Sequence, residues 1–317
     1  MLGYILRRLL QLVFVLCGLT IFLFILFETM PGDPARVMAG LGASKEAIEA
    51  IEVKLGLDKP FYERYWRLVS GLFSGQLQSM TYHERVWIVI LDRLPATVEL
   101  GFFAMVLSLF VAIPAGLLSA IFRNSSLDYV VTTVALTGIS IPIFWLALLL
   151  MLLFGAILRV LPVSGRGATL WGWSFLTFSG LRHLIIPAVS LSAPLTALNA
   201  RLIRADMLQV LRQDYMNTAR AKGVRESVVI IKHAFRNALA PVVTNIGLQM
   251  GIMIGGATLV ETTTAWPGIG RLMYTAILRR DEAVVLTLAL FIATFHMVSY
   301  LVVDILYVYI NPKVSYE

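Results

Sequence analysis

The chain has 317 residues, of which 58% are hydrophobic and only 14% are charged, and its formal net charge is +7. Soluble domains carry about 25% charged residues, so this composition excludes an ordinary soluble domain and indicates a polytopic membrane protein. The positive charge does not indicate a nucleic-acid-binding protein, because no zinc-ligand spacing and no aromatic–basic RNA-binding motif accompanies it. The single cysteine, Cys17, lies in an apolar run, so the chain has no disulfide framework.

Six runs of the sequence are free of charge and close to the ~20 residues that a helix needs to cross a bilayer. They are 9–27, 100–122, 129–158, 183–200, 237–260 and 283–303. We therefore expect an all-α protein with six transmembrane helices. The first run is too long for the apolar region of a signal peptide, so we expect an uncleaved first span. Another uncharged stretch, 167–181, is too short to span easily, and its glycines and tryptophans are typical of an interfacial loop.

Segment 31–95 follows the first run and contains two short amphipathic patterns. Ser44 is a suitable N-cap for a helix over KEAIEAIEVKL, which Gly56 ends. Pro60 then opens a second helix over FYERYWRLVSGL, whose apolar residues recur at helical spacing. A scaffold that packs on the membrane domain is a better interpretation of these helices than a ligand site. We divide the chain into 1–30, the external segment 31–95 and a five-helix core, 96–317, with a cytoplasmic loop at 201–240.

Two features inside the core have a structural and a functional interpretation. Glu99 follows Pro95, and we interpret it as a first-turn charge that favours the dipole of a helix beginning there. Gly247, Gly251 and Gly255 recur every four residues, a spacing that lets two helices approach closely. Packing within the subunit and an interface with a partner subunit along a pathway through the membrane are equally good explanations of these glycines.

The loop after the fourth run contains eight basic residues. Each Lys or Arg at the bilayer centre costs about 2.5–3.5 kcal/mol, so this loop lies outside the hydrocarbon. Short loops rich in Lys and Arg face the cytoplasm, which places this loop and both termini there and segment 31–95 on the other side. The eight residues are Arg201, Arg204, Arg212, Arg220, Lys222, Arg225, Lys232 and Arg236.

Apolar spacing within the loop predicts a helix, a tight turn and a second helix. Tyr215 and Ala219 share one face of a short helix, which Gly223 can end by adopting positive φ. Small residues at this bend would allow a groove on another protein to approach the backbone closely. The alternative is an ordinary basic loop solvated by water and anionic lipid headgroups.

The sequence of this loop resembles that of a known family. DYMNTARAKG at 214–223, followed by HAFRNALAPVVT at 233–244, is similar to the cytoplasmic loop in the permease subunits of ABC importers, within the oligopeptide/dipeptide/nickel permease family. Further segments match that family in order over essentially the whole chain. They are ILRRLL, MPGDPA, LGLDKP, RLPATVELG, TGISIPIFW, LPVSG, ARLIRADMLQVL, WPGIGRL and LVVDILY.

The resemblance implies a type I ABC importer permease fold and a coupling helix that docks on a cytoplasmic ATPase subunit. Asn217, Thr218 and Ala219 stand where the wider family has Glu-Ala-Ala, and Pro241 lies 18 residues after Gly223, which resembles the peptide-permease subgroup. The residues that match the coupling loop are Asp214, Tyr215, Thr218, Ala219, Ala221 and Gly223.

The resemblance also implies partners. They are a homologous second permease, which would make a heterodimer, two ATPase subunits that hydrolyse ATP with Mg, and an extracytoplasmic substrate-binding protein. The assembly would lie in the lipid of a bacterial or archaeal cytoplasmic membrane, with no nucleic acid. This chain has no G-x-x-x-x-G-K-[ST] motif of its own, so we expect it to bind no ATP by that route. Its four histidines are scattered, and we expect neither a metal site nor an enzyme.

Two rival functions remain. An ATP-independent secondary transporter or channel would be supported by inverted repeats or several buried charges, and neither is evident in the sequence. A membrane scaffold without transport would show no substrate-dependent ATPase activity. For an importer, family resemblance allows short peptides, nickel, a metallophore complex or glutathione, and the absence of clustered metal-ligand residues favours peptides.

Overall fold

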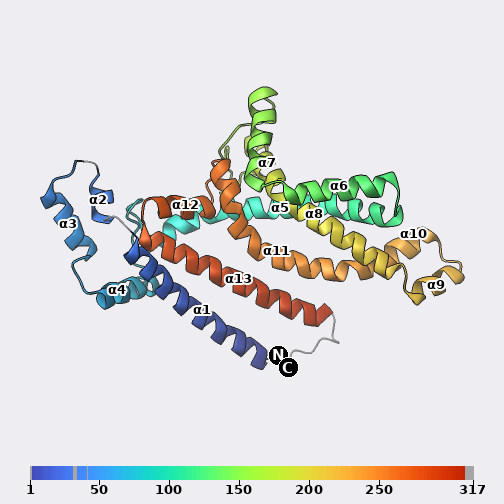
Figure 1. Ribbon diagram of the computed structural model, residues 1–317, viewed down its shortest axis with the longest axis horizontal. Helices are drawn as coiled ribbons and strands as arrows, with labels where there is room; N and C mark the ends of the chain where they lie inside the picture. The colour runs from blue at the N-terminus through green and yellow to red at the C-terminus, as the bar shows by residue number, and fades with distance from the viewer. Residues whose placement is uncertain (1, 31–33, 41, 311–317) are drawn as a thin grey trace. The chain divides into compact units, whose positions relative to one another are not determined.

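The computed structural model describes residues 2–30, 34–40 and 42–310, which form helices joined by turns and two isolated β-bridges (Figure 1). The chain divides into two compact units, one of residues 1–95, 268–298 and 316–317 and the other of residues 96–267 and 299–315. Helices α5 (Val86–Ile121) and α13 (Glu282–Ile310) contribute to both units.

The remaining helices belong to one unit each. The first unit contains α1 (Leu2–Thr29), α2 (Pro34–Ala39), α3 (Lys45–Leu55), α4 (Phe61–Ser74) and α12 (Ile269–Leu278). The second unit contains α6 (Ser126–Ser140), α7 (Ile143–Leu150), the π-helix η1 (Met151–Ile157), α8 (Phe178–Val210), α9 (Asp214–Ala221), α10 (Glu226–Val228), the π-helix η2 (Val229–Phe235) and α11 (Arg236–Thr263).

Four of the described helices have the length and hydropathy of a membrane span, namely α1, α5, α8 and α13. A fifth is present if α6 and the α7–η1 segment count as one broken span. The run 237–260 lies in α11, a 28-residue helix of about 42 Å. Within the described residues the fold is therefore an all-α membrane fold with four to five spans that meet both criteria.

The run 129–158, predicted as one helix, is not straight. Its two halves, Ser126–Ser140 and Ile143–Ile157, meet at an angle of 103°. Pro142 has no backbone N–H to donate and disfavours the helical conformation of the residue before it. Ile141 accordingly has φ −77° and ψ 125°, and α7 begins directly after the proline.

The two amphipathic helices expected in segment 31–95 are present as α3 and α4. Ser44 caps α3 by accepting a hydrogen bond from the Ala47 N–H, and Gly56 ends it in the left-handed conformation with φ 68°. Helix α4 packs against α1, where the Tyr65 hydroxyl lies 3.0 Å from Thr20 Oγ1 and the Phe24 and Phe61 rings are 4.9 Å apart. The helix is thus held by its aromatic face.

A buried carboxylate organises the loop between α4 and α5. Asp281 is fully buried, and its Oδ2 accepts hydrogen bonds from Ser79 Oγ at 2.5 Å and the Thr81 N–H at 2.9 Å. Its Oδ1 accepts from the Val284 N–H in the first turn of α13 at 3.3 Å. One acid therefore caps a long apolar helix and fixes a loop 200 residues away in the sequence.

The second unit has two apolar clusters along α5, α8 and α11. One surrounds Leu100, Leu184, Met253 and Trp266, and the other surrounds Ile203, Met207 and Met216. Between them, four polar side chains meet: Asn199 bonds Gln249 through both amide groups at 3.1 and 3.2 Å, and also contacts Ser108 at 3.2 Å and Asn245 at 3.1 Å. Sequence analysis missed this network, because its members come from three separate helices.

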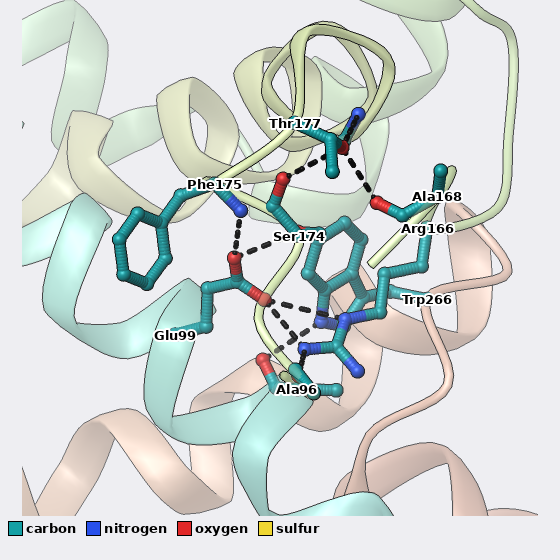
Figure 2. Close-up of polar contacts among 10 residues, drawn as sticks. Ala96, Glu99, Arg166, Ala168, Ser174, Phe175, Thr177 and Trp266 are labelled. Carbon is teal, nitrogen blue, oxygen red and sulfur yellow. Dashed lines mark hydrogen bonds and ion pairs between the residues drawn. The ribbon is translucent and has the colours of Figure 1, made fainter. Parts of the chain in front are cut away.

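A second buried carboxylate, Glu99, organises the loop between η1 and α8 (Figure 2). Its Oε2 accepts from Arg166 Nε at 3.2 Å and Nη2 at 2.7 Å. Its Oε1 accepts from Ser174 Oγ at 2.7 Å and the Phe175 N–H at 2.6 Å. All four donors belong to one loop, so we call this arrangement the Glu99 clamp.

The Glu99 clamp extends to the turn after α11. The Arg166 guanidinium lies 5.7 Å from the centre of the Trp266 ring, and Trp266 Nε1 donates to the Ala96 carbonyl at 2.8 Å (Figure 2). The Gly165 N–H donates to the Thr264 carbonyl at 2.9 Å. The loop, α5 and the end of α11 are thus fastened together around one ion pair.

The first-turn interpretation of Glu99 is wrong. Helix α5 begins at Val86 and continues through Pro95, so Glu99 lies well inside the helix. Its side chain is 0% exposed, where the charge requires the partners that Arg166, Ser174 and Phe175 provide.

We expect Glu99→Gln to destabilise the protein by about 3–5 kcal/mol, because it leaves the Arg166 guanidinium, whose side chain is only 13% exposed, without a counter-charge. In detergent, the variant should have a lower melting temperature and faster tryptic cleavage after Arg166. The matched control is Glu63→Gln, which removes an exposed ion pair with Lys59 and should change the melting temperature little. Equal effects of both substitutions would contradict the clamp.

Candidate functional site

The segment between α8 and α11 forms the helix, turn and helix that the sequence predicts. Helix α8 ends at Val210, and α9 begins at Asp214 with that acid in its first turn. Figure 1 shows α9 and α10 at the far end of α8 and α11, where the chain reverses. The short helix α9 is therefore the turning point of this part of the second unit.

Gly223 makes the turn after α9 possible. Its φ is 74°, a left-handed conformation that L-residues with a side chain adopt at a cost of about 1–2 kcal/mol. The Gly223 N–H donates to the Arg220 carbonyl at 2.9 Å. A Cβ atom at this position would meet nothing within 4 Å. The glycine is thus required by the backbone conformation, and the space beside it is open.

One face of α9 is exposed. Asp214, Tyr215, Thr218 and Ala221 are exposed, and Ala219 is half-buried. The Thr218 hydroxyl donates back to the Asp214 carbonyl at 3.2 Å, and the Tyr215 hydroxyl accepts from Asn237 Nδ2 at 3.0 Å. The structure therefore gathers the six predicted coupling-loop residues on one short helix and its turn, with small or hydroxylated side chains outward.

The opposite face of α9 is anchored by Met216, which sequence analysis missed. This side chain is 0% exposed and belongs to the apolar cluster of the second unit that also contains Ile203 and Met207 of α8 and Val229 and Ala234 of η2. The only sequence signal is one long apolar side chain within DYMNTARA. Met216 therefore connects α9 both to α8, which precedes it, and to η2, which follows it.

The eight basic residues of this loop do not form a uniform positive surface. Arg220 binds Glu226 at 2.9 Å, and the hydrogen bond from Arg220 lowers the pKa of the Glu226 carboxyl. Arg204 points inward and binds the buried Asp128 at 2.7 Å. The other six are exposed, namely Arg201, Arg212, Lys222, Arg225, Lys232 and Arg236.

The three glycines of α11 do not share one contact. A Cβ atom on Gly247 would lie 2.1 Å from Val303 Cγ2, so this glycine allows α11 and α13 to approach closely within the subunit. Gly251 is buried, whereas a Cβ on Gly255 would meet nothing within 4 Å. Packing within the subunit explains Gly247, and Gly255 remains open to a neighbour. Over the residues that the structure describes, no three His, Cys, Asp or Glu side chains gather to hold a metal ion.

Comparison with known proteins gives matches over the whole chain. A family model described as binding-protein-dependent transport system inner membrane component matches residues 112–316, and a model of the N-terminal part of such membrane components matches residues 1–101. The dipeptide transport system permease protein DppB of Alkalihalophilus pseudofirmus is 40% identical over 100% of both chains. The glutathione transport system permease protein GsiC of Escherichia coli O6:H1 is 39% identical, again over 100% of both chains.

Among solved structures, a chain of the MetNI methionine ABC transporter in inward-facing conformations has a TM-score of 0.51. The match covers 69% of this chain and 96% of that chain at 15% sequence identity. At this identity the likeness concerns the fold alone.

We expect Met216→Ala to loosen α9 without unfolding the rest of the chain. Removing a buried methionine side chain costs about 2–5 kcal/mol, and here the loss falls on a short helix with few other apolar contacts. Hydrogen–deuterium exchange should increase across 211–224 and stay unchanged across 96–112. The control Thr218→Ala removes only an exposed hydroxyl and should leave exchange at wild-type levels. Unchanged exchange in Met216→Ala would contradict the anchoring role.

Proposed function

Since this chain belongs to the family of binding-protein-dependent transport system inner membrane components, we propose that it forms half of the pathway of an ATP-driven importer. It is a multi-pass membrane protein and a permease component, and its proposed substrate is a short peptide delivered by an external binding protein. The observation that carries the proposal is α9, an anchored helix whose exposed face carries Tyr215, Thr218 and Ala221 beside a tight glycine turn. Such a helix fits the cleft of another protein.

The proposed topology has six spans with both termini in the cytoplasm. Helix α11 supplies the sixth span, and its length of 28 residues is sufficient to cross the hydrocarbon core. The excess of Lys and Arg around α9 supports a cytoplasmic position for this end of the second unit. Segment 31–95, with α3 and α4, and the loop that the Glu99 clamp holds then face the binding protein.

The proposed partners are two ATPase subunits, a second homologous permease and the binding protein. The proposal assigns the binding and hydrolysis of ATP with Mg to the ATPases. The sequence of this chain contains no phosphate-binding G-x-x-x-x-G-K-[ST] motif. Closure of the ATPases would move the two α9 helices together and change the spans between inward-facing and outward-facing states. A heterodimer of permeases is the arrangement that we favour.

Short peptides are the substrate class that the relatives favour. DppB is named for dipeptides and GsiC for glutathione, which is itself a small peptide-like molecule with free carboxylates. Nickel or a metallophore complex is a weaker proposal, since the described residues contain no cluster of metal ligands. An ATP-independent secondary transporter is the most distant alternative.

The test of the assembly is a mild-detergent pull-down of the tagged chain from its native membrane, with mass spectrometry of stoichiometric partners. We expect a second permease and one or two ATPases with phosphate-binding motifs. Recovery of the chain alone would contradict the importer and favour the secondary transporter.

We expect Ala221→Trp to abolish recovery of the ATPases while the chain still inserts and folds. Ala221 is exposed, so a large ring fits the isolated chain but occupies the space that a docked partner needs. The matched control is Ser227→Trp, an equally bulky change at an exposed position of α10, which should keep the ATPases bound. ATPase recovery with Ala221→Trp at the wild-type level would show that α9 is not the docking helix.

A further inference from the structure

One ion pair ties α8 to the hairpin of α5 and α6 close to α9. Arg204 donates to Asp128 through Nε at 2.7 Å and Nη2 at 2.8 Å, and the Asn124 N–H donates to the same carboxylate at 2.9 Å. The Ser119 hydroxyl, in the last turn of α5, also donates to Asp128. The buried carboxylate therefore receives donors from α5, from the turn before α6 and from α8.

The backbones of α5 and α8 are in direct contact beside this ion pair. A Cβ atom on Gly116 would lie 2.6 Å from the Ala200 carbonyl oxygen and 2.8 Å from Ile203 Cβ. Gly116 is one turn before Ser119, and Ala200 is one turn before Arg204. Such close packing resists sliding, because any shift of α8 meets main-chain atoms of α5.

Helix α9 is attached to the same end of α8. Three residues, 211–213, separate the two helices, and Met216 is buried with Ile203 and Met207 of α8. A displacement of α9 is therefore transmitted first to the last two turns of α8, which contain Arg204.

The segment that connects α9 to α11 is built differently from the one that connects α8 to α9. The chain returns from α10 into α11 through η2, seven residues of π-helix. A π-helix is rare, occurs mostly as a single turn inside an α-helix and is frequent at functional sites. The connection through α8 is continuous α-helix and is held by the ion pair and the Gly116 contact, whereas the connection through η2 interrupts the α-helix.

We propose that Asp128 and Arg204 are positioning residues for energy coupling: their ion pair carries movement of α9 into α5 and α6. This inference rests on the proposed function, since it requires an ATPase to move α9. A buried ion pair contributes little net stability compared with apolar residues of similar volume, so its value here is the fixed geometry of a bidentate contact.

The test uses proteoliposomes that contain the whole co-purified assembly and its binding protein. ATP hydrolysis and uptake of radiolabelled dialanine are measured together, with radiolabelled glutathione as the tracer if the unsubstituted assembly takes up only that. The quantity of interest is the number of substrate molecules taken up per ATP hydrolysed. A merely structural pair would lower both rates in proportion and leave this ratio unchanged.

We expect Asp128→Asn to keep the ATPases bound and hydrolysing while uptake per ATP falls about tenfold, within the range typical of coupling between sites. Arg204→Lys keeps the charge but loses the bidentate contact, so uptake per ATP should fall about threefold. Should Asp128→Asn fail to assemble, Ser119→Ala is the milder variant, because it removes one donor and keeps the ion pair, and its ratio should fall about twofold.

Two further variants separate coupling from stability. Glu99→Gln breaks another acid–arginine pair of the second unit, and its uptake per ATP should stay within about twofold of the unsubstituted chain. The double variant Asp128→Leu with Arg204→Met removes both charges at once and should recover the melting temperature lost in Asp128→Asn. Its uptake per ATP should remain low, because no directional contact joins α8 to α6.

The outcomes distinguish this inference from the function on which it rests. If the unsubstituted assembly shows no ATP-dependent uptake, the proposed function fails and the inference falls with it. If that assembly transports but Asp128→Asn matches Glu99→Gln in uptake per ATP, the inference is wrong and the importer stands. Recovery of the ratio in the double variant would also overturn it.

Discussion

The structure depends on how the chain satisfies carboxylates that it removes from water. An ionised acid in an apolar environment is very unfavourable unless it is paired and hydrogen-bonded. Glu99, Asp128 and Asp281 are all buried, and each accepts hydrogen bonds from at least three donors. The donors to Glu99 and most donors to Asp281 come from loops, and Asp128 accepts from two helices and a turn, so each acid fixes a loop or turn as well as a helix. Apolar helices need such buried polar contacts, because apolar packing alone specifies the relative position of helices poorly.

The helix α9 follows a different principle. Its buried contact is the single apolar side chain of Met216, and its outward face consists of small or polar residues around a left-handed glycine. Methionine fills irregular space and tolerates small shifts, whereas an ion pair demands one geometry. The soft contact therefore lies at the surface where a partner would dock. The stiff contact, between Arg204 and Asp128, lies two turns deeper along α8.

The sequence predicted the elements with local signals and missed those that depend on distant partners. Ser44, Gly56 and Gly223 cap or end helices through short-range hydrogen bonds or backbone conformation, so their roles follow from neighbours in sequence. The break at Pro142 also has a local cause, although hydropathy alone favoured one uninterrupted span.

The misses have the opposite origin. Glu99 looked like a helix-start residue because the residues that bury it, Arg166 and Ser174, are 67 and 75 positions away. No periodic pattern of apolar residues around Met216 marks it as buried. The cluster in which it is buried comes from helices distributed over 130 residues of the sequence. The family resemblance identified the loop, because the loop has a recognisable sequence motif. It did not identify Met216, because the side chains that pack around this residue lie far away in the sequence.

Within the second unit, the free-energy cost of separating the helices varies along their length. At one end, α5 is held by the Glu99 clamp, and near α9 by the ion pair of Asp128 and Arg204, where separation would leave a buried charge unpaired. Between these ends, α5, α8 and α11 meet through the neutral groups of Ser108, Asn199 and Gln249. A neutral hydrogen bond contributes only about 0.5–1.5 kcal/mol net, because water or another amide can replace either partner. Separation of α5, α8 and α11 at this network would therefore leave no buried charge unpaired, unlike separation at either ion pair.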